Sequence, residues 1–391
     1  MKKIRGIILF LLAMNILSLS VLADGNGDEH KSEIGISTYL GVGAILSLVL
    51  LVIGLILWNM TRKKLATSTN MKKNDRDLLR KKMSIQLMTS VIAGAVMLAA
   101  TIGWATTRLE SDESLELKHI HGLGYSADGD NLYIAAHDGV NLYAEDTWSN
   151  LHTKEEQHDF MGFSMVDEGF YSSGHPAPGS SLGNPFGVIK SDDMGESLKT
   201  LDLSGEMDFH EMAVGYNSHA IYVLNPEPNS RMDEAGVYYS IDEASTWEKS
   251  EMNGLEGAIR DIAVHPTEEE KVVVVTEVGA FYSEDFGNQF EPLVNATVTS
   301  TAFDQAGKLF MGIYEESNQL VEFDISTKEQ KEISIPSLKE EDAIAYITVN
   351  PQKADELTFA TFKKDVFQTK DMGGNWQQLA DLGITKDKKE E

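Results

Sequence analysis

The chain has 391 residues, no cysteine and a formal net charge of -28 at pH 7. This length allows one large domain with additional segments, and a chain without cysteine has no disulfides, thiolate metal ligands or thiol nucleophile. The first 106 residues hold 13 Lys/Arg and 6 Asp/Glu, a net of +7, which leaves -35 for the rest. The residues after 106 are strongly acidic, which argues against nucleic acid as a partner, because nucleic-acid affinity comes from basic side chains.

The first 23 residues have the organisation of a signal peptide. Three basic residues precede an apolar stretch from Ile7 to Leu22, and Val21 and Ala23 place small residues before a cleavage point. We therefore predict a signal peptide over 1–23, with an uncleaved signal anchor as the alternative. A short extracytoplasmic segment over 24–39 would follow it.

Two further apolar segments, 40–58 and 87–105, are each long enough to cross a bilayer. The loop between them, 59–86, is basic: nine Lys/Arg and two Asp lie between residues 62 and 82, whereas the outer flanks are acidic. Because basic loops remain in the cytoplasm, both flanks should lie outside. The sequence predicts a multi-pass protein of the cytoplasmic membrane, with an acidic linker over 106–116 that leads to an extracytoplasmic body.

From Leu117 onward, short apolar alternations separated by Gly, Asp and Asn replace the helical pattern. Six units of about 45 residues, each with four short strands, follow one another over 117–384, which is typical of propeller blades. We therefore predict an all-β, six-bladed β-propeller preceded by an α-helical transmembrane hairpin, with a charged tail over 385–391. A jelly roll is the main alternative, but it would not repeat one motif at a blade-like spacing.

One eight-residue motif recurs four times in the body: a hydroxyl residue, any residue, Asp, any residue, Gly or Ala, two more residues, and a large apolar residue. The copies occupy 191–198, 240–247, 283–290 and 369–376. The Asp can accept backbone N–H groups within a turn, and the Gly can take a positive φ. We therefore interpret the four Asp residues as structural: Asp193, Asp242, Asp285 and Asp371. Ala244, which replaces the Gly, should cost stability if that position needs a positive φ.

This motif resembles the Asp-box, or BNR repeat, of sialidases, xyloglucanases and the sortilin propeller. The body also resembles bacterial membrane-associated proteins labelled glycosylhydrolase-like, through Tyr171-Ser172-Ser173-Gly174-His175-Pro176 and Asn225-Pro226-Glu227-Pro228-Asn229-Ser230-Arg231-Met232. The resemblance spans the whole body. It implies a propeller whose Asp-boxes lie between the third and fourth strands of a blade.

Blade connectivity brings the starts of the first strands and the loops after the second strands to one mouth of the propeller. At this mouth we expect nine ligand-binding candidates: His119, His121, His137, His175, His210, Asn225, Glu227, Arg231 and Arg260. Since loops held by a rigid scaffold often carry function, we predict a site there for an envelope glycan, a protein or a metal ion. The alternative is that these side chains only satisfy one another and plug the channel.

Histidines dominate this set, which makes a divalent metal ion a specific possibility. His119 and His121 are two residues apart, so both face the same way on a strand. Together with His137, His175 and His210 they could hold zinc, copper or a similar ion.

The enzymatic alternative is glycoside hydrolysis, which uses a pair of carboxylates. Candidates at the same mouth are Asp138, Asp159, Asp208 and Glu227. A sialidase is not expected, because that activity needs three arginines for the substrate carboxylate. The chain beyond the membrane segments holds only Arg108, Arg231 and Arg260. We therefore favour a binding function over an enzymatic one.

Overall fold

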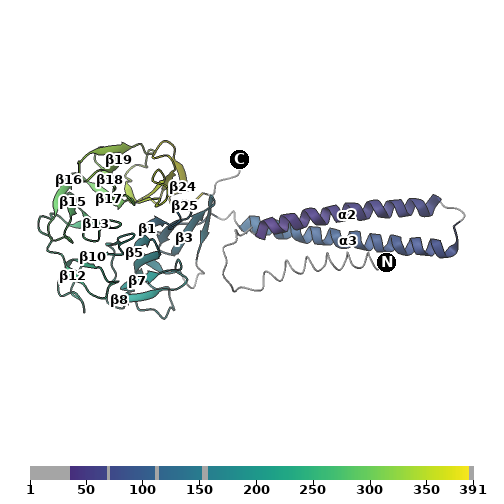
Figure 1. Ribbon diagram of the computed structural model, residues 1–391, viewed down its shortest axis with the longest axis horizontal. Helices are drawn as coiled ribbons and strands as arrows, with labels where there is room; N and C mark the ends of the chain where they lie inside the picture. The colour runs from purple at the N-terminus through teal and green to yellow at the C-terminus, as the bar shows by residue number, and fades with distance from the viewer. Residues whose placement is uncertain (1–35, 68–70, 111–113, 152–156, 387–391) are drawn as a thin grey trace. The chain divides into compact units, whose positions relative to one another are not determined.

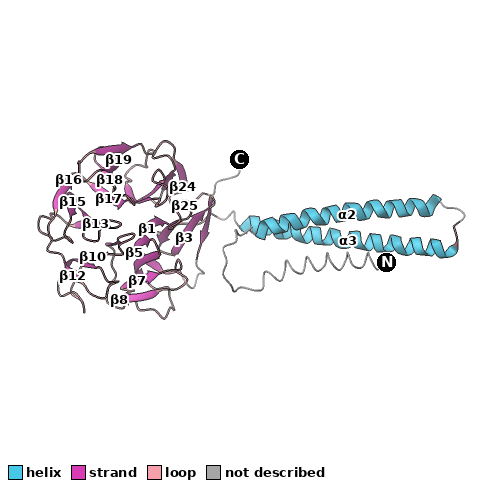
Figure 2. Ribbon diagram, viewed as in Figure 1, coloured by secondary structure: helices cyan, strands magenta, loops and turns pink. Residues whose placement is uncertain are grey.

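The computed structural model describes residues 36–67, 71–110, 114–151 and 157–386. The chain divides into a helical unit and a β unit, with the boundary after Ser111 (Figures 1 and 2). The predicted signal peptide (1–23), most of the segment 24–39 and nearly all of the predicted tail lie outside the described residues.

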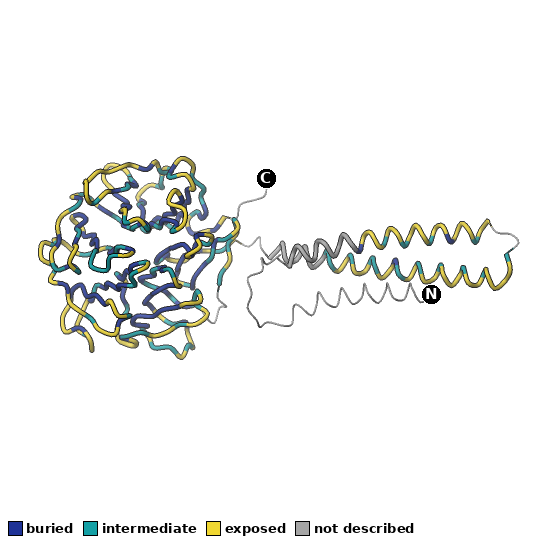
Figure 3. Tube along the Cα trace, in the orientation of Figure 1, coloured by how far each residue is buried: buried dark blue, intermediate teal, exposed yellow. Residues whose placement is uncertain are grey.

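Two long helices form the first unit, α2 (Ile36–Thr67) and α3 (Lys73–Glu110). Many of their apolar residues are exposed, and Figure 3 colours much of the described part of both helices as exposed. By length and composition, one helical segment in the described part of the chain could cross a membrane, Lys73–Thr101. The sequence predicted two such segments, but the one at 40–58 falls partly on residues whose side chains are not described. Among the described residues the structure therefore supports one membrane-capable helix, and the span at 40–58 stays a prediction.

The second unit consists of five four-stranded antiparallel sheets and one five-stranded sheet. This arrangement confirms the predicted six-bladed propeller. Blades one and two contain β1 (Ile120–Tyr125), β2 (Leu132–Ala136), β3 (Gly139–Ala144), β4 (Thr147–Asn150), β5 (Asp159–Val166), β6 (Gly169–His175), β7 (Val188–Ser191) and β8 (Lys199–Asp202). Blades three and four contain β9 (Met212–Val214), β10 (Ile221–Asn225), β11 (Gly236–Ser240), β12 (Glu248–Lys249), β13 (Ile259–Val264), β14 (Val272–Thr276), β15 (Gly279–Ser283) and β16 (Glu291–Val294). Blades five and six contain β17 (Val298–Phe303), β18 (Leu309–Tyr314), β19 (Asn318–Phe323), β20 (Gln330–Ile333), β21 (Ile344–Val349), β22 (Leu357–Thr361), β23 (Val366–Thr369), β24 (Gln377–Asp381) and β25 (Ile384–Thr385).

Burial decreases from the inner strands of each blade to its outer edge. The second strands are almost wholly buried, and β14 contains four consecutive valines. A strand covered on both faces has no solvent side, so its sequence is continuously apolar and β-branched. The fourth strands are more exposed, and both residues of β12 face solvent. The hydrophobic core therefore lies between neighbouring blades.

The ring closes between the first and last blades. Glu116 pairs with Ile384 of β25 in an antiparallel bridge. On either side of this bridge, the Leu117 amide donates to the Gly383 carbonyl at 2.7 Å, and the Leu115 amide donates to Thr385 Oγ1 at 2.7 Å. Behind these hydrogen bonds, one apolar cluster joins side chains of blades one and six: Leu117, Ile120, Leu123, Ile134, Ala360, Val366 and Leu379. The start and end of the propeller thus share one sheet edge and one core.

Each copy of the repeated motif occupies the turn between the third and fourth strands of a blade. In blade four, Asp285 Oδ1 accepts hydrogen bonds from Ser283 Oγ (2.7 Å) and from the Gln289 amide (2.9 Å). Ser283 Oγ accepts in turn from the Gly287 amide at 2.9 Å. The same three hydrogen bonds recur in the other copies. The four carboxylates are therefore engaged in holding turns.

Two consecutive residues in each turn have a left-handed backbone. In blade four these are Phe286, with φ of 61°, and Gly287, with φ of 80°. Ala244 occupies the second position in blade three and also has φ of 61°. Its methyl group is buried in the cluster that contains Tyr171 and Tyr238. Packing of the methyl group therefore offsets part of the backbone strain at Ala244.

We expect Gly287→Ala to reduce the free energy of unfolding by about 1–3 kcal/mol, the cost of a non-glycine residue held in a left-handed conformation. The added methyl would also lie 2.8 Å from Ser250 Oγ. Ala244→Gly should change stability by less than about 1 kcal/mol, because relief of strain is offset by loss of a buried methyl. Urea unfolding of the purified full-length chain measures both. Equal losses in the two variants would contradict this account of the turn.

Candidate metal and ligand site at the propeller mouth

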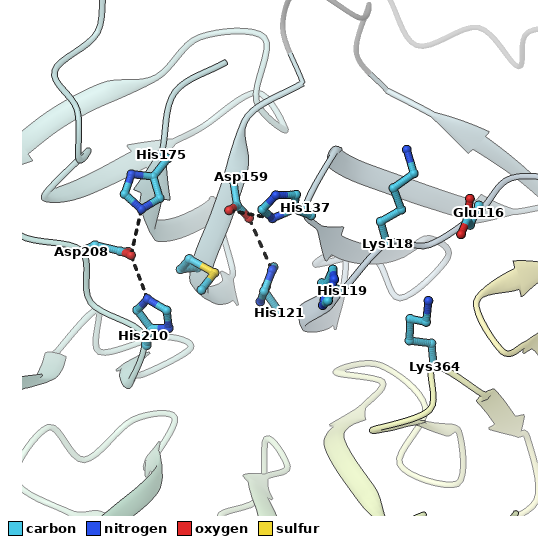
Figure 4. Close-up of a pocket in the computed structure, with 11 residues that line it drawn as sticks. Glu116, Lys118, His119, His121, His137, Asp159, His175, Asp208, His210 and Lys364 are labelled. Atoms are coloured by element: carbon cyan, nitrogen blue, oxygen red, sulfur yellow. Dashed lines mark hydrogen bonds and ion pairs between the residues drawn. The ribbon is translucent and has the colours of Figure 1, made fainter. Parts of the chain in front are cut away.

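A pocket of about 710 Å³ opens at one mouth of the propeller (Figure 4). It is lined by residues of blades one, two, three and six: Glu116, Lys118, His119, His121, His137, Asp159, Met161, His175, Asp208, His210 and Lys364. The structure therefore brings five histidines and two aspartates into one cavity, although they span some ninety positions of the sequence.

A bulge in the first strand of blade one positions His121. In the β1–β2 pairing, Ile120 lies opposite Ala136 and Gly122 lies opposite Ala135, so His121 has no cross-strand partner. Bulges of this kind redirect a side chain away from the regular pleat. The His119 and His121 rings are nearly parallel, with 13° between their planes and 6.5 Å between their centroids. The two side chains thus face the pocket together.

A first cluster joins His121, His137 and Asp159. His137 follows β2 directly, and Asp159 begins β5 in the next blade. His137 Nδ1 lies 2.9 Å from Asp159 Oδ2, and His121 Nε2 lies 3.4 Å from Asp159 Oδ1 (Figure 4). One donor atom from each residue lies within 4.8 Å of the other two. Two imidazoles and one carboxylate therefore converge on a small volume at the edge of the pocket.

Two buried atoms of this cluster have no hydrogen-bond partner within the described chain: His121 Nε2 and Asp159 Oδ1. They nevertheless face each other across 3.4 Å. Zinc bonds to nitrogen and oxygen are about 2.0–2.2 Å long, so two ligands at a tetrahedral angle lie about 3.3–3.6 Å apart. The separation of these two atoms fits a shared metal ion.

Burial lowers the pKa of His121, because an imidazolium loses hydration inside the pocket. The negative charge of Asp159 opposes this shift, whereas positive charge on His137, His119 and His210 would add to it. The lowered pKa favours neutral His121, and a neutral imidazole is the form that coordinates metal ions. Positive charge on any of three neighbouring imidazoles would thus disfavour protonation of His121.

A second cluster lies across the pocket, with Asp208 between two imidazoles. Asp208 Oδ2 lies 2.8 Å from His210 Nε2 and 3.2 Å from His175 Nε2. The other ring nitrogen of His175 lies 2.8 Å from Asn184 Oδ1. Figure 4 shows the two imidazoles on opposite sides of the carboxylate. Both imidazoles of this cluster are partly exposed, 46% for His175 and 56% for His210, whereas in the first cluster His137 is 59% exposed and His121 only 17%.

The other predicted ligand-binding residues lie outside this pocket and have local partners. Asn225 is buried and donates from Nδ2 to the Glu234 carbonyl, which holds the loop after β10. Arg231 Nε lies 2.8 Å from Asp202. Arg260 is largely exposed and lies 3.9 Å from Glu277.

Two of the four catalytic candidates also lie outside the pocket. Glu227 is exposed on the loop after β10. Asp138 lies 3.6 Å from Lys118 Nζ, so its carboxylate is paired with a lysine beside the pocket. The remaining candidates, Asp159 and Asp208, line the pocket, and each contacts two imidazoles.

Sequence reasoning missed three charged residues of the pocket wall: Glu116, Lys118 and Lys364. Glu116 and Lys118 lie on the segment that closes the ring, which the sequence analysis assigned partly to a linker. Lys364 comes from the loop after β22, in the last blade. His137 and His175 were assigned to the mouth because they follow the second strands of their blades. The same reasoning, applied to lysines, would have found Lys364.

Comparison with known proteins finds similar solved structures but no family. No family model matches it, and no curated protein matches it. A GH74 enzyme of Niastella koreensis has 12% identity and a TM-score of 0.48, with 69% of this chain and 46% of that chain covered. YCF48 bound to D1 peptide has 15% identity and a TM-score of 0.41, covering 68% and 83%. The extracellular domain of BT4673 from B. thetaiotaomicron has 13% identity and a TM-score of 0.44, covering 69% and 35%.

These neighbours are β-propellers. The chain spans less than half the length of the GH74 enzyme.

We expect Asp159→Asn to lower the pKa of His121 further, because the charge of Asp159 favours the imidazolium form. An NMR titration of the histidine Cε1–H resonances in the full-length chain measures this change. Asp138→Asn is the matched control, since Asp138 pairs with Lys118 and should leave the His121 titration in place. An unchanged or raised pKa in Asp159→Asn would contradict the described contact.

Proposed function

We propose that this chain is a membrane-anchored, extracytoplasmic propeller that binds a divalent transition-metal ion through His121, His137 and Asp159. The observation that carries this proposal is the convergence of three donor atoms within 4.8 Å. The donors come from two neighbouring blades. Their proximity therefore depends on the folded propeller and not on a local sequence motif. Two imidazoles and one carboxylate suit zinc and similar ions, and the fourth position would face the pocket.

The unsatisfied atoms of the cluster favour a ligand over a self-contained plug. Buried polar atoms in folded proteins nearly always have hydrogen-bond partners. His121 Nε2 and Asp159 Oδ1 have none in the described structure. A bound metal ion would contact both atoms, whereas without an ion each has only the other, at 3.4 Å.

The glycoside hydrolase alternative is less well supported by the pocket. Hydrolysis needs one carboxylic acid and one carboxylate directed at the scissile bond. Asp159 and Asp208 each lie between two imidazoles instead. The residues around both carboxylates are therefore better suited to coordination or binding than to acid–base attack on a sugar.

Anchoring rests on the helical unit. The segment Lys73–Thr101 is long and apolar enough to span a bilayer, and the loop before it is strongly basic. The positive-inside rule then favours a cytoplasmic loop and a propeller on the outer side. We extend the proposal to a second span at 40–58, and to membership of the body in the Asp-box propellers on the basis of its four repeated turns.

We expect the full-length protein, purified in detergent and dialysed against Zn²⁺, to retain about one ion per chain. His137→Ala and Asp159→Asn should each weaken Zn²⁺ binding by more than about tenfold, since even partners of metal ligands contribute 10–100-fold to affinity. Elemental analysis gives the stoichiometry and isothermal titration calorimetry gives the affinity.

His219→Ala is the matched control for the metal experiment. His219 Nε2 lies 2.6 Å from Asp167 Oδ1, but this pair is not part of a three-donor group in the described chain. The control should therefore bind Zn²⁺ like the wild type. Wild-type protein that retains no metal, or site variants that bind as well as the control, would refute the metal site.

The absence of cysteine allows a clean test of membrane orientation. Asn74→Cys places a thiol before the apolar part of α3, and Ser326→Cys places one on the exposed surface of blade five. In intact cells, a membrane-impermeant maleimide should label Ser326→Cys and leave Asn74→Cys unlabelled until the cells are lysed. Labelling of Asn74→Cys in intact cells would contradict the proposed orientation.

A further inference from the structure

Among the five imidazoles that line the mouth pocket, only that of His119 forms no ion pair with a carboxylate in the described chain. His121 and His137 contact Asp159, and the two histidines of the second cluster contact Asp208. The His119 side chain is exposed. It lines the pocket beside the three-donor cluster, as Figure 4 shows. The cluster therefore has an unengaged imidazole at its side.

The three imidazoles of blade one form a nearly equilateral triangle. The ring centroids of His121 and His137, two of the proposed ligands, lie 6.2 Å apart. The His119 centroid lies 5.8 Å from that of His137 and 6.5 Å from that of His121. His119 is therefore about as close to each ligand as the two ligands are to each other. Imidazoles on one tetrahedral zinc ion have centroids about 5 Å apart, because each nitrogen lies about 2.0–2.1 Å from the metal. The three rings thus need to approach one another by about 1 Å.

The backbone holds His119 beside His137. The His137 amide donates to the Lys118 carbonyl at 2.7 Å and to the His119 carbonyl at 3.2 Å. His119 has φ of 48°, in the left-handed region that residues other than glycine adopt uncommonly. Backbone conformations of this kind cluster at functional sites. The unusual conformation lies here at the residue whose imidazole is unengaged.

A side-chain rotation separates the described position of His119 from coordination. His119 is not one of the three donors that lie within 4.8 Å of one another, and its ring is nearly parallel to that of His121. Exposed side chains change rotamer within picoseconds to nanoseconds. The ring of His119 has no hydrogen bond or ion pair to a described residue that the rotation would break. A bound ion would thus gain a third nitrogen without the loss of an existing contact.

We propose that His119 turns onto the bound ion and becomes its fourth protein ligand, after His121, His137 and Asp159. The inference rests on the proposed metal site and completes its coordination. Catalytic zinc sites keep three protein ligands and one position for water, whereas structural sites have four protein ligands. A site closed by His119 therefore retains its ion and offers no position for a reactive water. Three imidazoles also favour zinc or copper over a hard cation such as Mg²⁺.

The test compares the Zn²⁺ affinities of full-length variants in detergent by isothermal titration calorimetry. His119→Asn removes the imidazole and introduces a residue that tolerates a left-handed backbone. We expect it to weaken Zn²⁺ binding by about tenfold or more, because even partners of metal ligands contribute 10–100-fold to affinity. His175→Ala is the matched control, since it removes a partly exposed imidazole of the same pocket that contacts Asp208. It should bind Zn²⁺ like the wild type.

Two further measurements distinguish a metal ligand from a residue that only shapes the pocket. X-ray absorption spectroscopy of the Zn²⁺-loaded protein should count three imidazoles in the wild type and two in His119→Asn. Added imidazole should restore part of the affinity that His119→Asn loses, because the exposed position of His119 is open to a small molecule. It should not increase the affinity of His175→Ala.

The outcomes separate this inference from the proposed function. Wild-type protein that binds Zn²⁺ through only two imidazoles, or His119→Asn that binds as tightly as the wild type, overturns the role of His119 and leaves the three-donor site in place. Wild-type protein that retains no Zn²⁺ overturns both. The far-UV circular dichroism of His119→Asn must match that of the wild type. If it does not, the imidazole count of the wild type decides.

Discussion

The antiparallel contact between the first and last segments of the propeller is the interaction on which the rest of the structure depends. Leu115 to Leu117 pair with β25, and the cluster that contains Leu117 and Val366 packs behind them. A propeller has a central channel and two mouths only while its ring is closed. Without covalent closure, since the chain has no cysteine, a few hydrogen bonds and one apolar interface maintain both clusters of the mouth.

The histidine-rich mouth illustrates how a repeated scaffold produces a site that occurs once. Every blade contributes a first-strand start and a loop after its second strand to the same mouth. Blades one and two place histidine or aspartate at both positions, and blade three adds Asp208 and His210 before its first strand, so the two clusters form on one half of the ring. The other half contributes Lys364 and the exposed pair of Arg260 and Glu277. The chemistry of the mouth depends on which side chains each blade carries there, because the backbone of the blades is nearly uniform.

The sequence predicted the repeated elements well, because each blade shows the same strand and turn pattern within about 45 residues. The connectivity of the predicted blades was enough to assign the five pocket histidines to one mouth. It could not select His121, His137 and Asp159 as a group, since their proximity depends on the bulge in β1 and on the contact between two blades. It also gave no sign that Phe286 takes a positive φ, because the turn's hydrogen bonds impose that conformation on a residue that rarely adopts it.

The position of Glu116 and Lys118 on the closing segment has a thermodynamic consequence. These residues line the pocket, and Glu116 also pairs with β25. A ligand that needs the complete pocket wall binds the closed ring and not the opened one. Mass action then stabilises closure by about 2.7 kcal/mol when the free ligand is at 100 times its Kd. Occupancy of the mouth would thereby stabilise the closed ring, and the lifetime of the ring against local unfolding at its seam would increase with ligand concentration.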